Sequence, residues 1–233
     1  MQGKSVNAGQ GIEWFKCGWN LFKQDFGTWL IMFILFIVLS IVLSFIPIIG
    51  SMLLMLISPA LMAGFMYAAS EMSQGSSINI AYLFQGFKDK EHRNKLLILG
   101  AIYLLAQVIV MAIMVAFIGG NAVMIAEPGQ MDTELIMTSG KAFLMLLAFL
   151  IWVIVMFGFI YAAPLVMFDK LSPVESIKAS YSASFKNVLS LLVFGLIYLL
   201  LAVVAAIPFG LGFLILIPVS ILALYCSYKS IFH

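Results

Sequence analysis

Charge is the scarcest feature of this sequence. Only 9% of its 233 residues are Asp, Glu, Lys or Arg, whereas 64% are apolar. A soluble domain carries about 25% charged residues, so the composition excludes a soluble globular protein and predicts one that lies almost entirely in a membrane. Four tracts contain no Asp, Glu, Lys or Arg at all, namely residues 26–70, 96–126, 142–168 and 187–228.

The lengths of these tracts predict six membrane-spanning helices. A spanning helix needs about 20 apolar residues. The first and last tracts are long enough for two helices each, and the middle two for one each. The predicted fold class is therefore all-α, a polytopic membrane protein that forms a single integral membrane domain over residues 1–233. Its loops are too short to hold a separate soluble domain.

The few basic residues are unevenly placed. Eleven of the twelve Lys and Arg residues fall on the side of the two termini, and only Lys141 falls on the other side. Basic residues collect on the cytoplasmic side of membrane proteins, so both termini are predicted to be cytoplasmic. The one sizeable loop predicted on the opposite side, residues 119–141, carries the acids Glu127, Asp132 and Glu134.

Reactive side chains are also rare. The two histidines, His92 and His233, have no neighbouring arrangement of Ser or Cys with an acid, and hydrolysis needs a base beside a nucleophile. The charge-free spans argue against a proton pump, a voltage sensor or an ion-coupled carrier. The sequence therefore predicts no enzyme, no catalytic residue and no cofactor.

Only two cysteines occur, Cys17 and Cys226, and both lie near the side predicted to be cytoplasmic. A reducing compartment disfavours a disulfide between them. Without nearby His or Cys partners they also make a poor metal site, and no metal is predicted. Basic residues that are sparse and close to the membrane give no support to nucleic-acid binding.

An amphipathic segment precedes the first predicted span. Over residues 11–26 the apolar positions Ile12, Phe15, Trp19, Phe22 and Phe26 follow steps of three and four, which predicts one apolar helix face lying in the membrane interface. Aromatic–lysine dipeptides precede the later hairpins as well. The candidate interfacial or lipid contacts are Trp14, Trp19, Phe22, Lys23, Phe87, Lys88, Phe185 and Lys186.

These elements suggest an internal repeat of three units, at about residues 11–71, 78–169 and 173–233. Each unit has an interfacial helix, a span and a second span that contains proline. Ser172-Pro173-Val174-Glu175 predicts a capped start for the third interfacial helix. Coincidence of aromatic–lysine pairs at membrane boundaries is the alternative. The units run in parallel, so the inverted repeats common in secondary transporters are absent.

Five residues within the spans are candidates for helix packing or for a cavity. Pro59 has Ser58 beside it to satisfy freed backbone groups, and Pro164 is the expected place for a kink in a long fourth span. Gly64 lies in a small-residue stripe that lets another helix approach closely. Gln107 either forms an interhelical hydrogen bond or lines a substrate cavity. The full set is Pro59, Gly64, Gln107, Pro164 and Pro218.

Three segments carry a family resemblance: Gly18-Trp19-Asn20-Leu21-Phe22-Lys23, Ser58-Pro59-Ala60-Leu61-Met62-Ala63-Gly64 and Leu83-Phe84-Gln85-Gly86-Phe87. They resemble an uncharacterised family of bacterial six-span integral membrane proteins. That family is distantly similar to the membrane domain of glycerophosphodiester phosphodiesterases, although no catalytic residue carries over. The resemblance implies a multi-pass protein of the bacterial inner (cytoplasmic) membrane and leaves its function open.

The residues favour a non-enzymatic membrane protein that acts through lipid or protein contacts, as a scaffold or assembly partner. The alternative is a transport component or channel for an apolar or lipid-like substrate, because prolines let the spans bend. The expected partners are membrane lipids and a protein partner or a second copy of the chain, with no nucleic acid.

Overall fold

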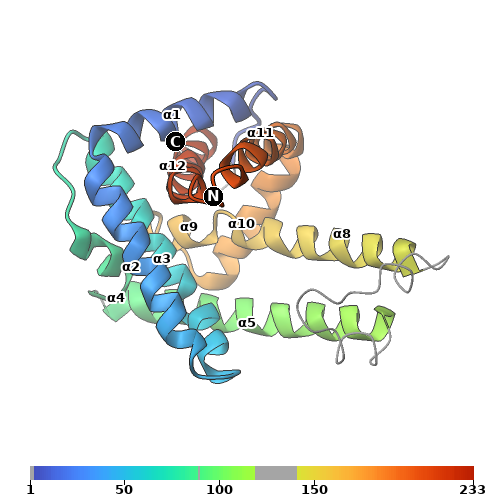
Figure 1. Cartoon of the computed structure of the whole chain (residues 1–233). Coiled ribbons are helices and arrows are strands. Elements are labelled where there is room, and N and C mark those ends of the chain that lie inside the picture. The colour runs from blue at the N-terminus through green and yellow to red at the C-terminus, as the bar shows by residue number, and fades with distance from the viewer. Residues whose placement is uncertain (1–2, 89, 119–140) are drawn as a thin grey trace.

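The protein is all-helical (Figure 1). The computed structural model describes residues 3–88, 90–118 and 141–233, and within these ranges there is no β-strand. This confirms the predicted fold class. The sizeable loop predicted between the third and fourth spans, with Glu127, Asp132 and Glu134, lies outside the described residues.

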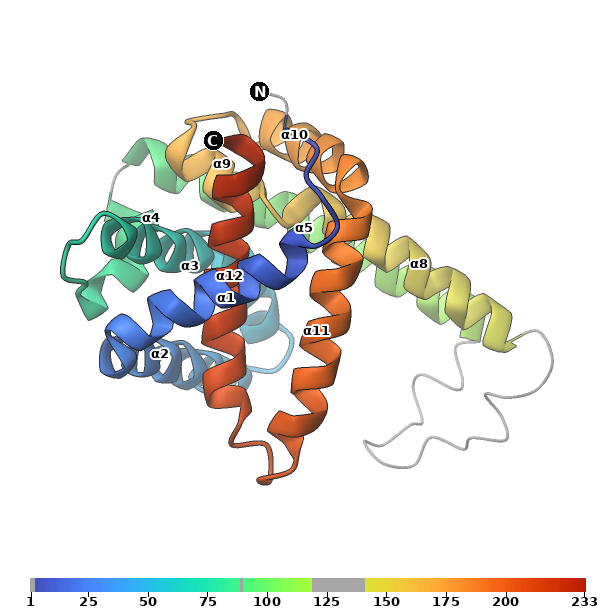
Figure 2. The same cartoon turned by 90° about the horizontal axis from the view of Figure 1, so that it is seen from above.

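Within the described ranges, six helices are long and apolar enough to cross a membrane, as the charge-free tracts predict. They form three hairpins that point in different directions (Figures 1 and 2). In chain order they are α2 (Phe26–Ser44), α3 (Ile49–Ser73), α5 (Lys90–Ile118), α8 (Lys141–Phe159) with its continuation α9 (Ala162–Phe168), α11 (Val188–Ala206) and α12 (Phe213–Phe232).

Shorter helices precede each hairpin: α1 (Gln10–Gln24), the 3-10 helix η1 (Ile80–Phe84) with α4 (Gln85–Lys88), and α10 (Pro173–Lys186). We use the name base for α1, η1, α4, α9 and α10 together with the adjoining ends of the spanning helices. We use the name arms for the rest of the three hairpins, which lie farther from these short helices. Segments near both ends of the chain meet in the base, where Lys4 N donates to Ile231 O at 2.7 Å. The order of short helix, span and span occurs three times, although the internal repeat itself stays a prediction.

The hydrophobic core lies in the base. The larger core cluster joins side chains from α1, α2, α3, α9, α10 and α12 around Trp14, Trp29, Tyr161 and Tyr228, each at most 2% exposed. The arms, in contrast, carry exposed apolar side chains on every hairpin, such as Phe45, 79% exposed. Apolar side chains can face outward in this way where lipid is the surrounding solvent.

Helix α1 packs on α12 and α11 rather than lying free on a membrane surface. Its buried side is Gly11, Trp14, Phe15, Gly18, Leu21 and Phe22, so Phe15 and Phe22 of the predicted apolar face are buried. The other three predicted residues, Ile12, Trp19 and Phe26, are 44% to 48% exposed. The buried side of α1 is therefore rotated about the helix axis relative to the predicted apolar face, which corrects the prediction.

The reason for this rotation is a close crossing of α1 over α12 and α11 (Figure 2). A Cβ atom on Gly18 would lie 2.5 Å from Ala223 N and 2.6 Å from Val219 O, both on α12. A Cβ atom on Gly11 would lie 2.6 Å from Ser190 O on α11. Only glycine permits such an approach of backbone to backbone, so these two positions fix which side of α1 is buried.

Cys17 of α1 and Cys226 of α12 form a disulfide in this structure, contrary to the expectation that a reducing compartment disfavours one. Their Cα atoms lie 6.3 Å apart although 209 residues separate them in the sequence. The expectation rested on the compartment alone. No pattern in the sequence indicates that the first helix docks on the last one, which is what brings the two cysteines together.

Candidate functional site

The break between α8 and α9 is the first polar feature of the base. Pro164 cannot continue a helical hydrogen-bond ladder, and its ring clashes with the carbonyl of Ile160. Tyr161 N, which in an unbroken helix would donate to Phe157 O, donates instead to Ser180 Oγ at 3.1 Å. Ser180 Oγ in turn donates to Phe157 O at 2.7 Å. One hydroxyl of α10 thus bridges the break, and the kink predicted at Pro164 is confirmed.

Ser180 belongs to a buried serine row on α10. Ser176, Ser180 and Ser184 follow at intervals of four residues and are fully buried. Ser184 Oγ donates to Phe157 O at 3.1 Å, and Ser176 Oγ donates to Pro173 O at 2.8 Å. Buried hydroxyls cost little when they are hydrogen-bonded, so the row holds α10 against α8 and α9. The interval of four was the available sequence signal for this row.

A second polar cluster joins the ends of α9 and α12. Tyr228 Oη donates to Asp169 Oδ2 at 2.6 Å, and His233 Nε2 lies 3.0 Å from Tyr228 Oη and 3.6 Å from Asp169 Oδ1. The Asp169 side chain is 11% exposed. The cluster therefore ties the last helix to α9.

The outside of the base carries three aromatic–lysine pairs, which include five of the predicted interfacial positions. Lys23 Nζ lies 5.8 Å from the centre of the Trp19 ring, and Lys88 Nζ lies 6.0 Å from the Tyr82 ring centre. Phe185, 55% exposed, precedes Lys186. We call Trp19–Lys23, Tyr82–Lys88 and Phe185–Lys186 the aromatic–lysine pairs. Among the described residues none of their lysines forms a salt bridge with an acid.

Three other predicted lipid contacts are corrected, because their side chains pack in the core. Trp14 and Phe22 are 2% and 1% exposed, and Trp14 Nε1 donates to Ser230 Oγ of α12 at 2.8 Å. Phe87 is partly buried against both core clusters. Aromatic residues occur on two neighbouring sides of α1, so the sequence alone did not separate the side facing protein from the side facing outward.

The predicted packing residues lie on different elements and do not form one site. Gly64 meets η1, since a Cβ atom there would collide with the Leu83 carbonyl oxygen. The carbonyl of Met55, freed by Pro59, accepts a hydrogen bond from Ser58 Oγ at 3.0 Å, as predicted. Pro218 is buried within α12. Gln107 Nε2 on α5 is buried and has no hydrogen-bond partner in the described part of the chain, so the expected interhelical bond from this atom is absent.

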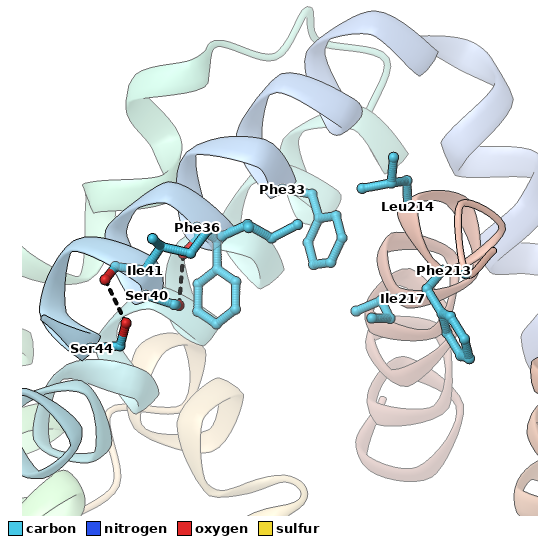
Figure 3. A pocket seen from close by; sticks show the side chains of 10 residues that line it. Phe33, Phe36, Ser40, Ile41, Ser44, Phe213, Leu214 and Ile217 are labelled. Carbon is cyan, nitrogen blue, oxygen red and sulfur yellow. Dashed lines mark hydrogen bonds between the residues drawn. The ribbon is translucent and has the colours of Figure 1, made fainter. Parts of the chain in front are cut away.

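An apolar groove of about 580 Å³ opens between α2 and α12 in the arms (Figure 3). Its volume falls within the range of small-molecule sites, roughly 300–1,000 Å³. The two serine hydroxyls in it are already used, because Ser40 Oγ donates to Phe36 O at 2.8 Å and Ser44 Oγ donates to Ile41 O at 2.7 Å. The lining residues are Phe33, Phe36, Ile37, Ser40, Ile41, Ser44, Gly210, Phe213, Leu214 and Ile217.

The groove was not foreseen from the sequence. Its two walls are far apart along the chain, and each reads only as part of an apolar span. The serines were expected to bond back to their own helices, which the structure confirms for Ser40, Ser44, Ser51 and Ser220. Because the hydroxyl protons of Ser40 and Ser44 are bonded within their own helix, the groove offers a largely apolar surface.

Comparison with known proteins finds a curated relative that matches along the whole chain. A protein described as a probable inner membrane protein from Burkholderia thailandensis is 26% identical over 253 aligned positions, which cover 100% of this chain and 93% of the relative. No protein-family model matches the sequence, and no solved structure matches it. Together with six helices apolar enough to cross a membrane, this similarity supports a multi-pass inner membrane protein.

Proposed function

We propose that this protein is non-enzymatic and acts through contacts with membrane lipids, with its base on the cytoplasmic side of the bacterial inner membrane. The observation that carries the proposal is the groove between α2 and α12. It lies between two helices that are apolar enough to span a membrane. A groove in that position is surrounded by hydrocarbon, and an acyl chain is the occupant that its surface suits.

The hydrogen bonding of the groove supports an apolar occupant. Ser40 and Ser44 donate to carbonyls of their own helix, so neither hydroxyl proton is left for a polar ligand. A polar group placed there would lose its hydrogen bonds to water and find no hydroxyl proton to replace them, which costs free energy. A hydrocarbon chain loses nothing and gains contact with Phe33, Phe36 and Leu214.

The aromatic–lysine pairs support contact with lipid headgroups at the base. Amphipathic rings are enriched at the headgroup level, and lysines near it attract anionic lipids, each by about 1 kcal/mol. Lys23, Lys88 and Lys186 mark three candidate contacts with lipid headgroups, one before each hairpin. Lys16 offers a matched control, because its ammonium is paired with Glu13 Oε1 at 2.8 Å.

The test of the groove fills it with a larger side chain. In Leu214→Trp the indole occupies the groove, and the purified protein should retain about one lipid fewer per chain in quantitative lipid mass spectrometry. Leu200→Trp is the matched control, because Leu200 is 70% exposed on α11 and lies outside the groove. Equal lipid retention by the two variants would contradict an acyl chain in the groove.

A second test separates headgroup binding from acyl-chain binding. The triple variant Lys23→Gln, Lys88→Gln and Lys186→Gln should lose its preference for anionic over zwitterionic lipid in mixed vesicles, while Lys16→Gln keeps it. An unchanged preference in the triple variant would remove the aromatic–lysine pairs from the proposal and leave the groove untouched.

The orientation of the base can be measured independently. In a variant with Cys17→Ser and Cys226→Ser, a cysteine replacing Lys90 in the base should react only with reagents that cross the membrane. A cysteine replacing Ile48, 77% exposed at the tip between α2 and α3, should react with reagents that do not cross it. The reverse pattern would overturn the cytoplasmic position of the base.

The alternative function is a transport component or channel for an apolar or lipid-like substrate. The observation that favours it is that Pro59 and Pro218 lie within the continuous helices α3 and α12, and Pro164 breaks the fourth span, so every hairpin has a place to bend. Reconstituted protein would then speed the transfer of a fluorescent phospholipid between leaflets, and Leu214→Trp would slow it. Equal rates with and without protein would exclude transport of that lipid.

Other predictions stand beside this proposal. A scaffold or assembly role and a protein partner or second copy stay predictions, as does the resemblance to the membrane domain of glycerophosphodiester phosphodiesterases. The three-unit repeat gains support from two hairpin tips. In both, a non-glycine residue after proline has positive φ, Ile48 at 63° after Pro47 and Phe209 at 53° after Pro208. Such backbone is rare for bulky residues.

A further inference from the structure

We propose that Cys17 and Cys226 form a reversible thiol–disulfide latch that fastens α1 to α12 under oxidising conditions. The inference rests on the proposed orientation, which places both cysteines in a reducing compartment. Disulfides in such a compartment are usually transient and respond to oxidants. The chain has only these two cysteines, and the fold brings them together across 209 residues.

The two sulfur atoms differ in access, and this assigns their roles. Cys17 lies on the exposed side of α1, next to the buried Gly18. Cys226 is 7% exposed within the core of the base. Attack by a thiolate needs access to the partner molecule, so Cys17 reacts first with an external oxidant and Cys226 resolves the product.

The reaction balances with a low-molecular-weight disulfide as the oxidant. Cys17 gives up its proton, and its thiolate attacks one sulfur of the external disulfide, which forms a mixed disulfide and releases one thiolate. Cys226, after losing its proton, attacks Cys17 Sγ, which forms the internal bond and releases the second thiolate. The two released thiolates take up the two protons, and the external disulfide is reduced while the two cysteines are oxidised.

The latch acts on a contact that exists without it. Gly18 packs on the backbone of Ala223, and Trp14 Nε1 donates to Ser230 Oγ, on either side of the cysteines along both helices. The reduced protein therefore keeps α1 docked, and oxidation adds a covalent link. Because α1 continues into α2, the link also fastens the base end of the pair α2 and α12, whose arms line the groove.

The thiol state can be trapped in cells. Acid quenching followed by tagging with maleimide–polyethylene glycol should show two free thiols in untreated cells and none after brief exposure to diamide, with the thiols recovered in dithiothreitol. The purified oxidised protein should also melt several degrees higher than the reduced protein. Cys17→Ser should show no such difference, which separates the latch from other effects of the reductant.

Two results would overturn the proposal. Thiols that stay free after diamide would show that the bond does not form in the cell. A disulfide already complete in untreated cells and resistant to dithiothreitol would show a permanent structural bond. Labelling of a cysteine at position 90 in the variant without native cysteines reports orientation separately, so a wrong orientation is distinguishable from a latch that fails.

Discussion

The two halves of α3 have opposite surroundings although both are apolar. In the arm, Ile49 and Met52 are 66% and 44% exposed, whereas in the base Leu61 and Met66 are completely buried. The same contrast separates whole helices, because 56% of the most apolar stretch of α12 is buried but only 11% of that of α8. Hydropathy is therefore no guide to which apolar residues hold this molecule together.

The contrast between the base and the arms shows which interactions hold the helices together. In lipid there is no hydrophobic gain when one apolar helix leaves hydrocarbon to contact another, so association depends on close packing and hydrogen bonds. The base supplies both, through glycines at helix crossings and through serine and tyrosine hydroxyls that bond between elements. In the arms, close contacts hold together the two helices of one hairpin, as at Gly50 against Leu43 and Gly212 against Ala205, and the three hairpins diverge from one another (Figure 2).

The largest expected effect compares two aromatic residues of α1. Phe22→Ala removes a ring that is 1% exposed and should lower the free energy of unfolding by about 3–5 kcal/mol, because it leaves a cavity in the base. Trp19→Ala removes a ring that is 44% exposed and should cost less than about 1 kcal/mol. Denaturant titrations in detergent, followed by circular dichroism, measure both. Similar costs would show that α1 is not docked as described.

The next effect compares two glycines. Gly18→Ala places a methyl group against the backbone of α12 and should cost about 3 kcal/mol through overpacking. Gly195→Ala is the matched control, since nothing lies within 4 Å of a Cβ atom there. Alanine is the better helix former by about 1 kcal/mol, so this control should be neutral or stabilising. If Gly18→Ala behaved like the control, the close crossing of α1 over α12 would be wrong.

These contrasts explain how far the sequence predicts the fold. Charge-free tracts locate all six spanning helices, because a membrane span needs length and apolarity and little else. Prolines locate the α8–α9 break, and Ser172 locates the start of α10 with a complete capping box. The directions of the hairpins depend instead on contacts between residues of different elements. A single sequence does not show which residues make those contacts.

The candidate sites show the same limit. Trp19, Lys23, Lys88, Phe185 and Lys186 lie on the outside of the base as expected, because lysine marks exposed positions. Trp14 and Phe22 were assigned to lipid because aromatic rings suit both a core and an interface. The groove and the disulfide join α12 to α2 and α1 across most of the chain, and no local pattern records such pairings.

A smaller effect tests the polar side of the comparison. Ser180→Ala removes the hydroxyl that bridges Tyr161 N and Phe157 O, and an unsatisfied buried amide should cost about 2 kcal/mol. Ser182→Ala, on the same helix and only partly buried, is the control and should change stability little. Thermal melting of both variants in the same detergent decides between them. Equal melting temperatures would mean that the break near Pro164 needs no bridge.

The smallest effect is expected at the exposed start of α10, where the base meets water. Ser172 caps the helix and donates to Glu175 Oε2 at 2.6 Å, so Ser172→Ala should cost about 1 kcal/mol near neutral pH. Hydrogen bonds from the Ser172 side chain and backbone lower the pKa of Glu175 below its ordinary value of 4.5.

A carboxyl whose pKa is lower in the folded state stabilises the fold above its unfolded pKa, and this contribution is lost as the pH falls through the folded pKa. The difference in melting temperature between the original protein and Ser172→Ala should therefore shrink on acidification to about pH 3. It should not vanish, because Glu175 N still donates to Ser172 Oγ at 3.3 Å. A difference that stays constant with pH would show that the carboxylate contributes nothing to the cap.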